Sequence, residues 1–178
     1  PGNWNDAANW STNATPTSSD ICIIPATPPG PYPDLMMPGT NVCGSLTIES
    51  GGNAPMLTIH TDVELDVFGS FTDNYGLVFI SGGKLDIGGD ATFAKGVSIS
   101  IPTGEIEVDG STAINGYILS ITDGTFDANG AFAAAAATIS FPSADGTLSV
   151  AGSVSSYGVL DDFGGTVIYD GGSQTVLS

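Results

Sequence analysis

The hydrophobic residues of this chain recur in one short pattern, which reads apolar, any residue, apolar, any residue, glycine. The pattern occupies six segments, 65–69, 85–89, 106–110, 126–130, 148–152 and 167–171, and its closing glycines are 20, 21, 20, 22 and 19 residues apart. Alternation of apolar and other residues is typical of a strand that buries one face. The glycines are expected at sharp corners, where glycine allows φ to be positive. Each period therefore predicts short strands separated by turns.

Other apolar columns share this period. One column is predicted at Val78, Ile99, Leu119, Phe141 and Leu160; its neighbour contains Ile80, Ile101 and Ile121 and then lapses at Ser143 and Asp162; a third contains Phe71, Ala91, Thr112, Phe132, Val154 and Ser173. A meander or sandwich would also have short strands, but it would not repeat residue types every 20 positions. Stacked coils do, because like residues fall above one another. We predict an all-β fold, a single-stranded parallel β-solenoid (β-helix) with about 20 residues per coil.

Residues 1–42 do not follow the repeat. They contain both tryptophans, Trp4 and Trp10, and eight of the 11 prolines. Proline removes backbone donors and suits exposed edges, and tryptophan supplies apolar area. We expect residues 1–42 to form an irregular N-terminal cap with the first rung, and residues 43–178 to form the coils. The same tryptophans are also candidate contacts for a glycan or another surface.

The two cysteines, Cys22 and Cys43, are 21 residues apart, which is one coil period. Residues one period apart are expected in adjacent rungs, at a separation near the lower end of the disulfide range. We predict a structural disulfide between them, and two buried free thiols are the alternative.

The charge of the chain is strongly negative. Its 178 residues include 19 Asp and Glu, no Arg and only Lys84 and Lys95, for a formal net charge of −17. So few cations cannot neutralise a row of phosphates, which argues against nucleic-acid binding and against anionic membrane surfaces. No apolar run approaches the roughly 20 residues of a membrane span, so no membrane insertion is expected. The surface rich in Ser, Thr, Gly and Asn favours an extracellular location.

Four carboxylates occupy equivalent positions on consecutive coils, namely Asp66, Asp86, Glu107 and Asp127. They are expected to point outward, where stacked like charges repel one another. A hard cation such as Ca²⁺ takes oxygen ligands and is the candidate cofactor of this ladder, with a solvated acidic face as the alternative. We identify no catalytic residues: the single His60 is expected to be structural, and an outward ladder on a convex rod is expected to form no pocket.

Several short motifs resemble the repetitive cell-surface proteins of Bacteroidota. They are Gly2-x-Trp4-Asn5-Asp6, Asn9-Trp10-Ser11, Pro16-Thr17-Ser18-Ser19-Asp20, Ile24-Pro25, Tyr32-Pro33, Cys43-Gly44-Ser45-Leu46-Thr47-Ile48, and the ending Gly165-Thr166-Val167-Ile168-Tyr169-Asp170-Gly171 with Gln174-Thr175-Val176. The resemblance covers most of the chain. It implies a secreted β-solenoid of the adhesin or fibre type, exported by the type nine secretion system.

These observations predict a non-enzymatic extracellular structural protein, a β-solenoid module or subunit of a surface fibre, filament or adhesin. We expect it to self-associate head to tail into a homopolymer, or to belong to a longer repeat chain, because an open last coil is a template for another strand. The alternatives are a glycan- or surface-binding module that uses the N-terminal aromatics and, less favoured, a polysaccharide-active β-helix enzyme.

Overall fold

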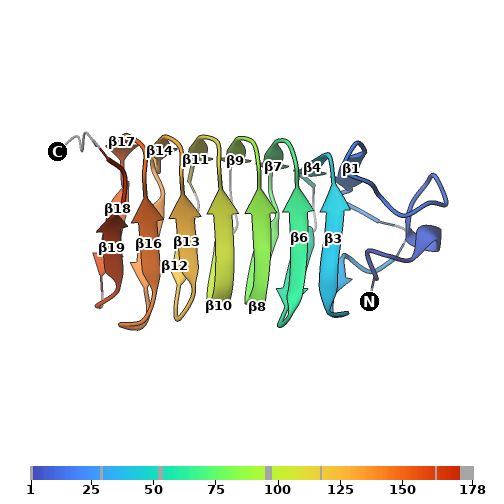
Figure 1. Ribbon diagram of the computed structural model, residues 1–178, viewed down its shortest axis with the longest axis horizontal. Helices are drawn as coiled ribbons and strands as arrows, with labels where there is room; N and C mark the ends of the chain where they lie inside the picture. Colours follow the sequence, from blue (N-terminus) through green and yellow to red (C-terminus); the bar gives the residue numbers. More distant parts are fainter. Residues whose placement is uncertain are drawn as a thin grey trace.

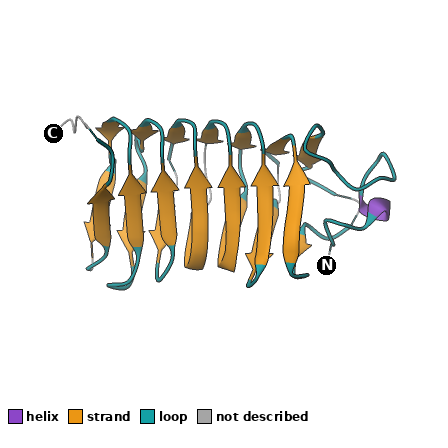
Figure 2. Ribbon diagram, viewed as in Figure 1, coloured by secondary structure: helices purple, strands orange, loops and turns teal. Residues whose placement is uncertain are grey.

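The computed structural model describes residues 2–28, 30–51, 54–94, 98–116, 118–162 and 164–172. The chain forms a parallel β-solenoid of about seven turns with about 21 residues per turn, as the repeat predicts. Strands of successive turns lie side by side along the long axis, and the N-terminal segment lies at one end (Figures 1 and 2).

The turns build three faces, which we number in chain order. The first face contains β2 (Asp34–Leu35), β5 (Met56–His60), the N-terminal halves of β8 (Leu77–Ile87) and β10 (Ser98–Val108), β12 (Ile118–Ile121), β15 (Thr138–Phe141) and β18 (Val159–Asp162). The second face contains β3 (Gly39–Cys43), β6 (Val63–Val67), the C-terminal halves of β8 and β10, β13 (Thr125–Ala128), β16 (Thr147–Val150) and β19 (Thr166–Tyr169). The third face contains β1 (Ile21–Ile24), β4 (Ser45–Ile48), β7 (Phe71–Asp73), β9 (Ala91–Phe93), β11 (Thr112–Ile114), β14 (Phe132–Ala133) and β17 (Val154–Ser156).

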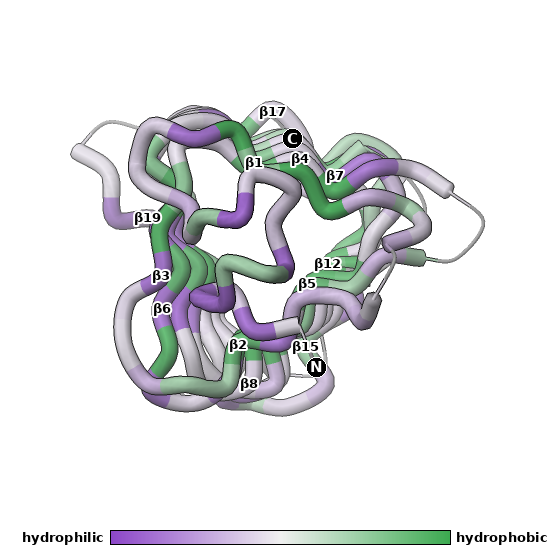
Figure 3. Tube along the Cα trace, turned by 90° about the vertical axis from the view of Figure 1, so that its right-hand side faces the viewer, coloured by the Kyte–Doolittle hydropathy of each residue, from purple (hydrophilic) through white to green (hydrophobic). Residues whose placement is uncertain are grey.

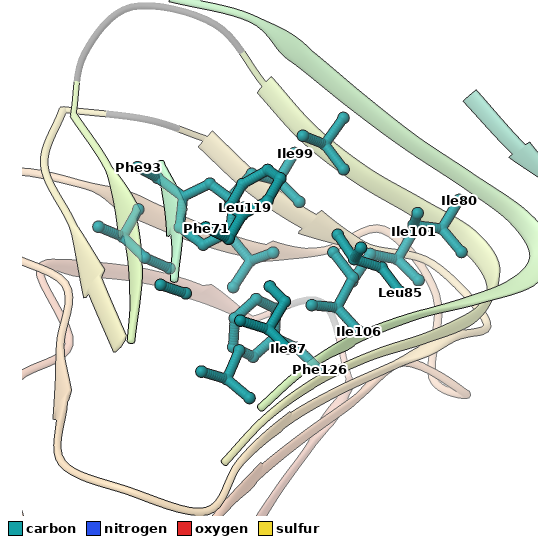
Figure 4. Packing of buried hydrophobic residues seen from close by; sticks show 14 of the residues in the cluster. Phe71, Ile80, Leu85, Ile87, Phe93, Ile99, Ile101, Ile106, Leu119 and Phe126 are labelled. Atoms are coloured by element: carbon teal, nitrogen blue, oxygen red, sulfur yellow. The ribbon is translucent and has the colours of Figure 1, made fainter. Parts of the chain in front are cut away.

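Alternate residues of these strands point into one continuous core. The column predicted from the repeat is confirmed on the second face: its members pair in register as Leu65, Leu85, Ile106, Phe126, Leu148 and Val167. Seen along the axis, hydrophobic stretches recur in the strands around the coil (Figure 3). Side chains from the three faces meet in the middle, as Phe93, Ile106 and Leu119 illustrate (Figure 4). Removal of this apolar area from water is the main force that holds the coils together.

The predicted column on the first face is wrong at one position. Ile139, not Phe141, pairs with Leu119 and Leu160. Phe141 instead stands opposite Asp162 in the neighbouring column, where Ser143 was expected. The physical reason is loop length: residues 142–146 join β15 to β16, whereas only residues 122–124 make the corresponding turn between β12 and β13. Counting back seven residues from Leu148 therefore stops two residues short of Ile139.

The repeat glycines lie at corners, but the expected reason was wrong. Positive φ occurs at other glycines, such as Gly82 and Gly104, and not at Gly89 or Gly110. The repeat glycines stack on one another with backbone hydrogen bonds; the amide of Gly110 donates to the carbonyl of Gly89 at 3.1 Å. A Cβ at Gly110 would lie 2.5 Å from the Gly89 carbonyl group, so only a residue without a side chain fits.

The N-terminal cap packs on the first rung. It contains a short 3-10 helix, η1 (Ala7–Asn9), and the boundary predicted at residue 42 falls inside β3. Trp4 is 2% exposed and donates its indole N–H to the carbonyl of Val42 at 3.2 Å. Trp10 packs edge-on against Trp4, with ring centroids 4.8 Å apart, and donates to the Trp4 carbonyl at 2.7 Å.

Candidate functional site

The second face carries an acidic column. Asp66, Asp86, Glu107 and Asp127 occupy equivalent positions on consecutive strands, as the sequence predicts. All four side chains point away from the core, and each residue is half-buried. The parallel stacking of the strands places these like charges within one column, about 5 Å from rung to rung.

Among the described residues of this face, Lys84 is the one that carries a positive charge. It stands beside Glu64 and Glu105 in its own column, yet its ammonium reaches diagonally to Glu107 and lies 3.6 Å from Asp86. Burial opposes the charge of Lys84, but the hydrogen bond to Glu107 and the charge of Asp86 outweigh it and raise the pKa of the ammonium. The same hydrogen bond lowers the pKa of Glu107. Lys95, the other lysine, lies outside the described residues.

In the remaining carboxylates of the column, burial outweighs the favourable charge of Lys84. Burial, together with the charges of Glu64 and Asp86, raises the pKa of Asp66. Burial likewise raises the pKa of Asp86 and of Asp127. One carboxylate oxygen of Asp66 and one of Asp127 are buried with no hydrogen-bond partner among the described residues. Protonation or a nearby cation would therefore relieve unfavourable charge in this column.

The geometry selects three members of the acidic face as candidate ligands. Oxygens of Glu64, Asp66 and Asp86 lie within 4.8 Å of one another. The predicted Ca²⁺ ladder is thus divided: Asp66 and Asp86 come together with Glu64, a residue that was not among the predicted ligands, while Glu107 is held by Lys84 and by Asn129 at 3.2 Å. Oxygen donors at this spacing suit a hard cation such as Ca²⁺.

The second face has a shallow depression of about 560 Å³ along one edge, widely open to solvent, and Gly39, Gly82 and Gly104 are among the residues that line it. Glu64, Lys84 and Glu105 also line the depression. The absence of side chains at the glycines creates the hollow, which the pattern of apolar residues could not show.

The two cysteines meet across the core rather than along a column. Cys22 in β1 stands opposite Leu46, and Cys43 in β3 stands opposite Val67, so the argument from adjacent rungs was wrong. The structure has both as buried free thiols that are hydrogen-bonded to each other. This hydrogen bond and burial raise the pKa of Cys43. The predicted disulfide between them stays a prediction.

We expect the thiol oxidant diamide to join these two cysteines within one chain. Two thiols lose two hydrogens to the oxidant, and a loop of this length adds roughly 3 kcal/mol to the free energy of unfolding. Intact mass under non-reducing conditions would show the loss of two hydrogens, and the melting temperature would rise. Cys43→Ser is the control and would show neither change. Oxidation to covalent dimers instead would contradict the prediction.

The other predicted contacts have different surroundings. Both tryptophans border a cavity of about 630 Å³ in the N-terminal segment. Trp4 is covered, so its ring serves the cap, whereas Trp10 is half-buried. His60 lies with its Nε2 2.7 Å from an Asp34 carboxylate oxygen, in a half-exposed pair that joins β5 to β2. Tyr32 donates its hydroxyl to the Ala26 carbonyl at 2.6 Å.

The fold and this face together define a repeat protein of the β-solenoid class with an acidic face. No protein-family model matches the chain, and no curated protein or solved structure is significantly similar to it. Among the described residues, no helix is long and apolar enough to span a bilayer.

Proposed function

We propose that this chain is a non-enzymatic structural module of an extracellular fibre, filament or adhesin at the cell surface. Its rungs share one core, so its stability grows with each added rung. The resemblance of its N-terminal motifs and final coil to surface proteins of Bacteroidota supports the same role. In this proposal the rod extends, stacks on further β-structure and presents its faces.

The last rung carries the proposal. Leu160 is 44% exposed, although Ile139 directly beneath it in the same column is fully buried. Tyr169 is 46% exposed above the buried Val150. Among the described residues this apolar core layer is covered on one side only, and with the strand edges of β18 and β19 it is the surface on which another rung would stack.

We expect the protein to self-associate through this rung, and Leu160→Glu to abolish the association. A charge on the core layer would have to be buried without a partner. Sedimentation velocity across a range of concentrations measures the effect. Because each copy carries a charge of −17, association should strengthen with ionic strength. Met36→Glu, at a residue that is 56% exposed on the first rung, is the matched control. A monomer at high concentration and high salt would contradict the proposal.

Electron microscopy of the same samples separates the modes of assembly. Particles twice the length of one rod indicate pairing between two last rungs, which leaves the N-terminal cap in place. Long filaments indicate the head-to-tail stacking expected from the sequence, which requires the cap to move aside. Both outcomes support the last rung as the interface.

A glycan-binding module is the second candidate, because Trp10 borders the N-terminal cavity. Aromatic rings stack on sugars when one face is accessible, which favours Trp10 over the covered Trp4. Glycan-array binding that is lost in Trp10→Ala and kept in Tyr75→Ala would support this candidate. Tyr75 is 38% exposed and is not among the residues that line the cavity.

A further inference from the structure

Strand β1 has one open edge. It pairs with β4 alone; the carbonyl of Asp20 accepts from the Ser45 amide at 3.2 Å, and the carbonyl of Ile24 accepts from the Glu49 amide at 2.9 Å. Alternate residues of a parallel strand direct their backbone groups to opposite edges. The N–H and C=O groups of Ile21 and Ile23 therefore face away from β4, and no described residue pairs with them.

The cap contacts the other two strand edges at this end of the rod. Gly2 bridges to the β2 edge, where its carbonyl accepts from the Asp34 amide at 3.1 Å. The indole of Trp4 occupies the β3 edge through its hydrogen bond to the Val42 carbonyl. The cap thus lies in the path of a whole incoming rung, whereas no described residue pairs with the outer edge of β1.

The open edge lies beside the N-terminal cavity of about 630 Å³. Trp10, Pro16, Pro28, Pro31, Cys22 and Ile23 are among the residues that line the cavity. The prolines have no N–H, so this wall cannot close the edge by strand pairing. The one carboxylate among the lining residues, Asp20, accepts from the Thr17 amide and hydroxyl, each at 2.7 Å.

We infer that β1 binds an extended peptide segment of another molecule, which adds to the third face as an extra strand. A row of unpaired backbone donors and acceptors is the chemistry that recognises extended polypeptide, and neighbouring apolar pockets accept alternate side chains. Ile21 and Ile23 are 77% and 49% exposed and would pack against β-branched side chains of that strand. The charge of −17 favours a basic or uncharged segment over an acidic one.

This partner is distinct from the proposed stacking surface at the other end of the rod. A second copy of the chain would bring a whole rung to a capped end and would add like charge. A single peptide strand is narrow enough to lie beside the cap, and a basic or uncharged peptide adds no like charge. We therefore expect it to bind the monomer one to one.

The test uses the synthetic peptide KVTVTVK with the full chain. Titration followed by the fluorescence of the two tryptophans, and by NMR, should show saturable binding with shifted Ile21 and Ile23 amides. A version with alternate amides N-methylated should bind about thirtyfold more weakly, because it loses the two hydrogen bonds that its N–H groups would donate to the carbonyls of Ile21 and Ile23. The acidic analogue EVTVTVE should also bind more weakly at low salt.

A protein variant provides an independent check. Ile23→Pro removes an N–H from the open edge and leaves the pairing with β4, whereas Ile23→Thr keeps that N–H. Binding lost in Ile23→Pro and kept in Ile23→Thr supports the inference; if Ile23→Pro does not fold, the N-methylated peptide decides. Equal binding of the N-methylated peptide, binding of cellohexaose alone, or no saturable binding would overturn it. The stacking proposal is tested separately by the Leu160→Glu variant, so either proposal can fail without the other.

Discussion

Gly110→Ala is expected to lower the melting temperature by about 10 °C. Its Cβ would lie 2.5 Å from the carbonyl carbon and oxygen of Gly89 and 2.6 Å from an Asp90 oxygen. Backbone atoms of two stacked corners must then separate, and overpacking of this kind costs about 3 kcal/mol. At roughly 2–4 °C per kcal/mol for a chain of this size, the shift is measurable by circular dichroism or calorimetry.

Two control variants separate space from backbone conformation. Gly30→Ala places a Cβ where no atom lies within 4 Å, so its melting temperature should be unchanged. Gly116→Ala meets no atom either, but φ at this residue is +75°, so about 1 kcal/mol of strain is expected. A smaller effect for Gly110→Ala than for Gly116→Ala would show that the corners relax more easily than their stacking indicates.

Lys84→Gln is expected to destabilise the solenoid at low salt by several degrees, more than an isolated surface ion pair contributes. The variant leaves Asp86, Glu105 and Glu107 facing one another with no cation among the described residues of that face. The measurement is a thermal melt at low and high ionic strength. Lys84→Arg keeps the charge and is the matched control. An unchanged melt at low salt would show that solvent alone screens the column.

The same carboxylates predict a rise in stability on mild acidification. Folded-state pKa values raised above the ordinary 3.8 of Asp66 and Asp86 and 4.5 of Glu105 mean that the folded chain binds more protons than the unfolded chain. Their stabilising effect is therefore present below the ordinary pKa and is lost as the pH rises through the folded value. Glu107, whose pKa is lowered, acts oppositely and loses its contribution below about pH 4.5. We expect the melting temperature to rise as the pH falls from neutrality towards the ordinary pKa values of these groups, and more steeply in Lys84→Gln.

Calcium distinguishes screening from ion binding on this face. At matched ionic strength, CaCl₂ should raise the melting temperature more than NaCl if Glu64, Asp66 and Asp86 hold the ion. Asp66→Asn should remove that difference, whereas Asp145→Asn, an exposed residue outside the trio, should keep it. An equal effect of both salts would assign the face to general screening.

Much of the architecture follows from the repeat alone. Residues one period apart become neighbours in adjacent rungs. Leu65, Leu85 and Ile106 each begin one copy of the repeat, so they lie in one column. The outward acidic column, with Asp66 and Asp86, follows for the same reason. The count fails only where a turn changes length, as it does after Phe141, because periodicity contains no information about where inside a coil the extra residues lie.

Only the tertiary structure determined the contacts between residues of different columns. Whether Cys22 meets Cys43 depends on how three faces fold around one core. The ion pair between Lys84 and Glu107 depends on the Lys84 side chain extending to a residue of the neighbouring column on the next strand. Likewise, only the stacked backbone shows that Gly110 is needed for space, and only the position of the cap shows that one edge of β1 is left open. The sequence determined the order of the rungs, because stacking preserves the spacing along the chain; the angles of the corners determined the rest, because they set which faces meet.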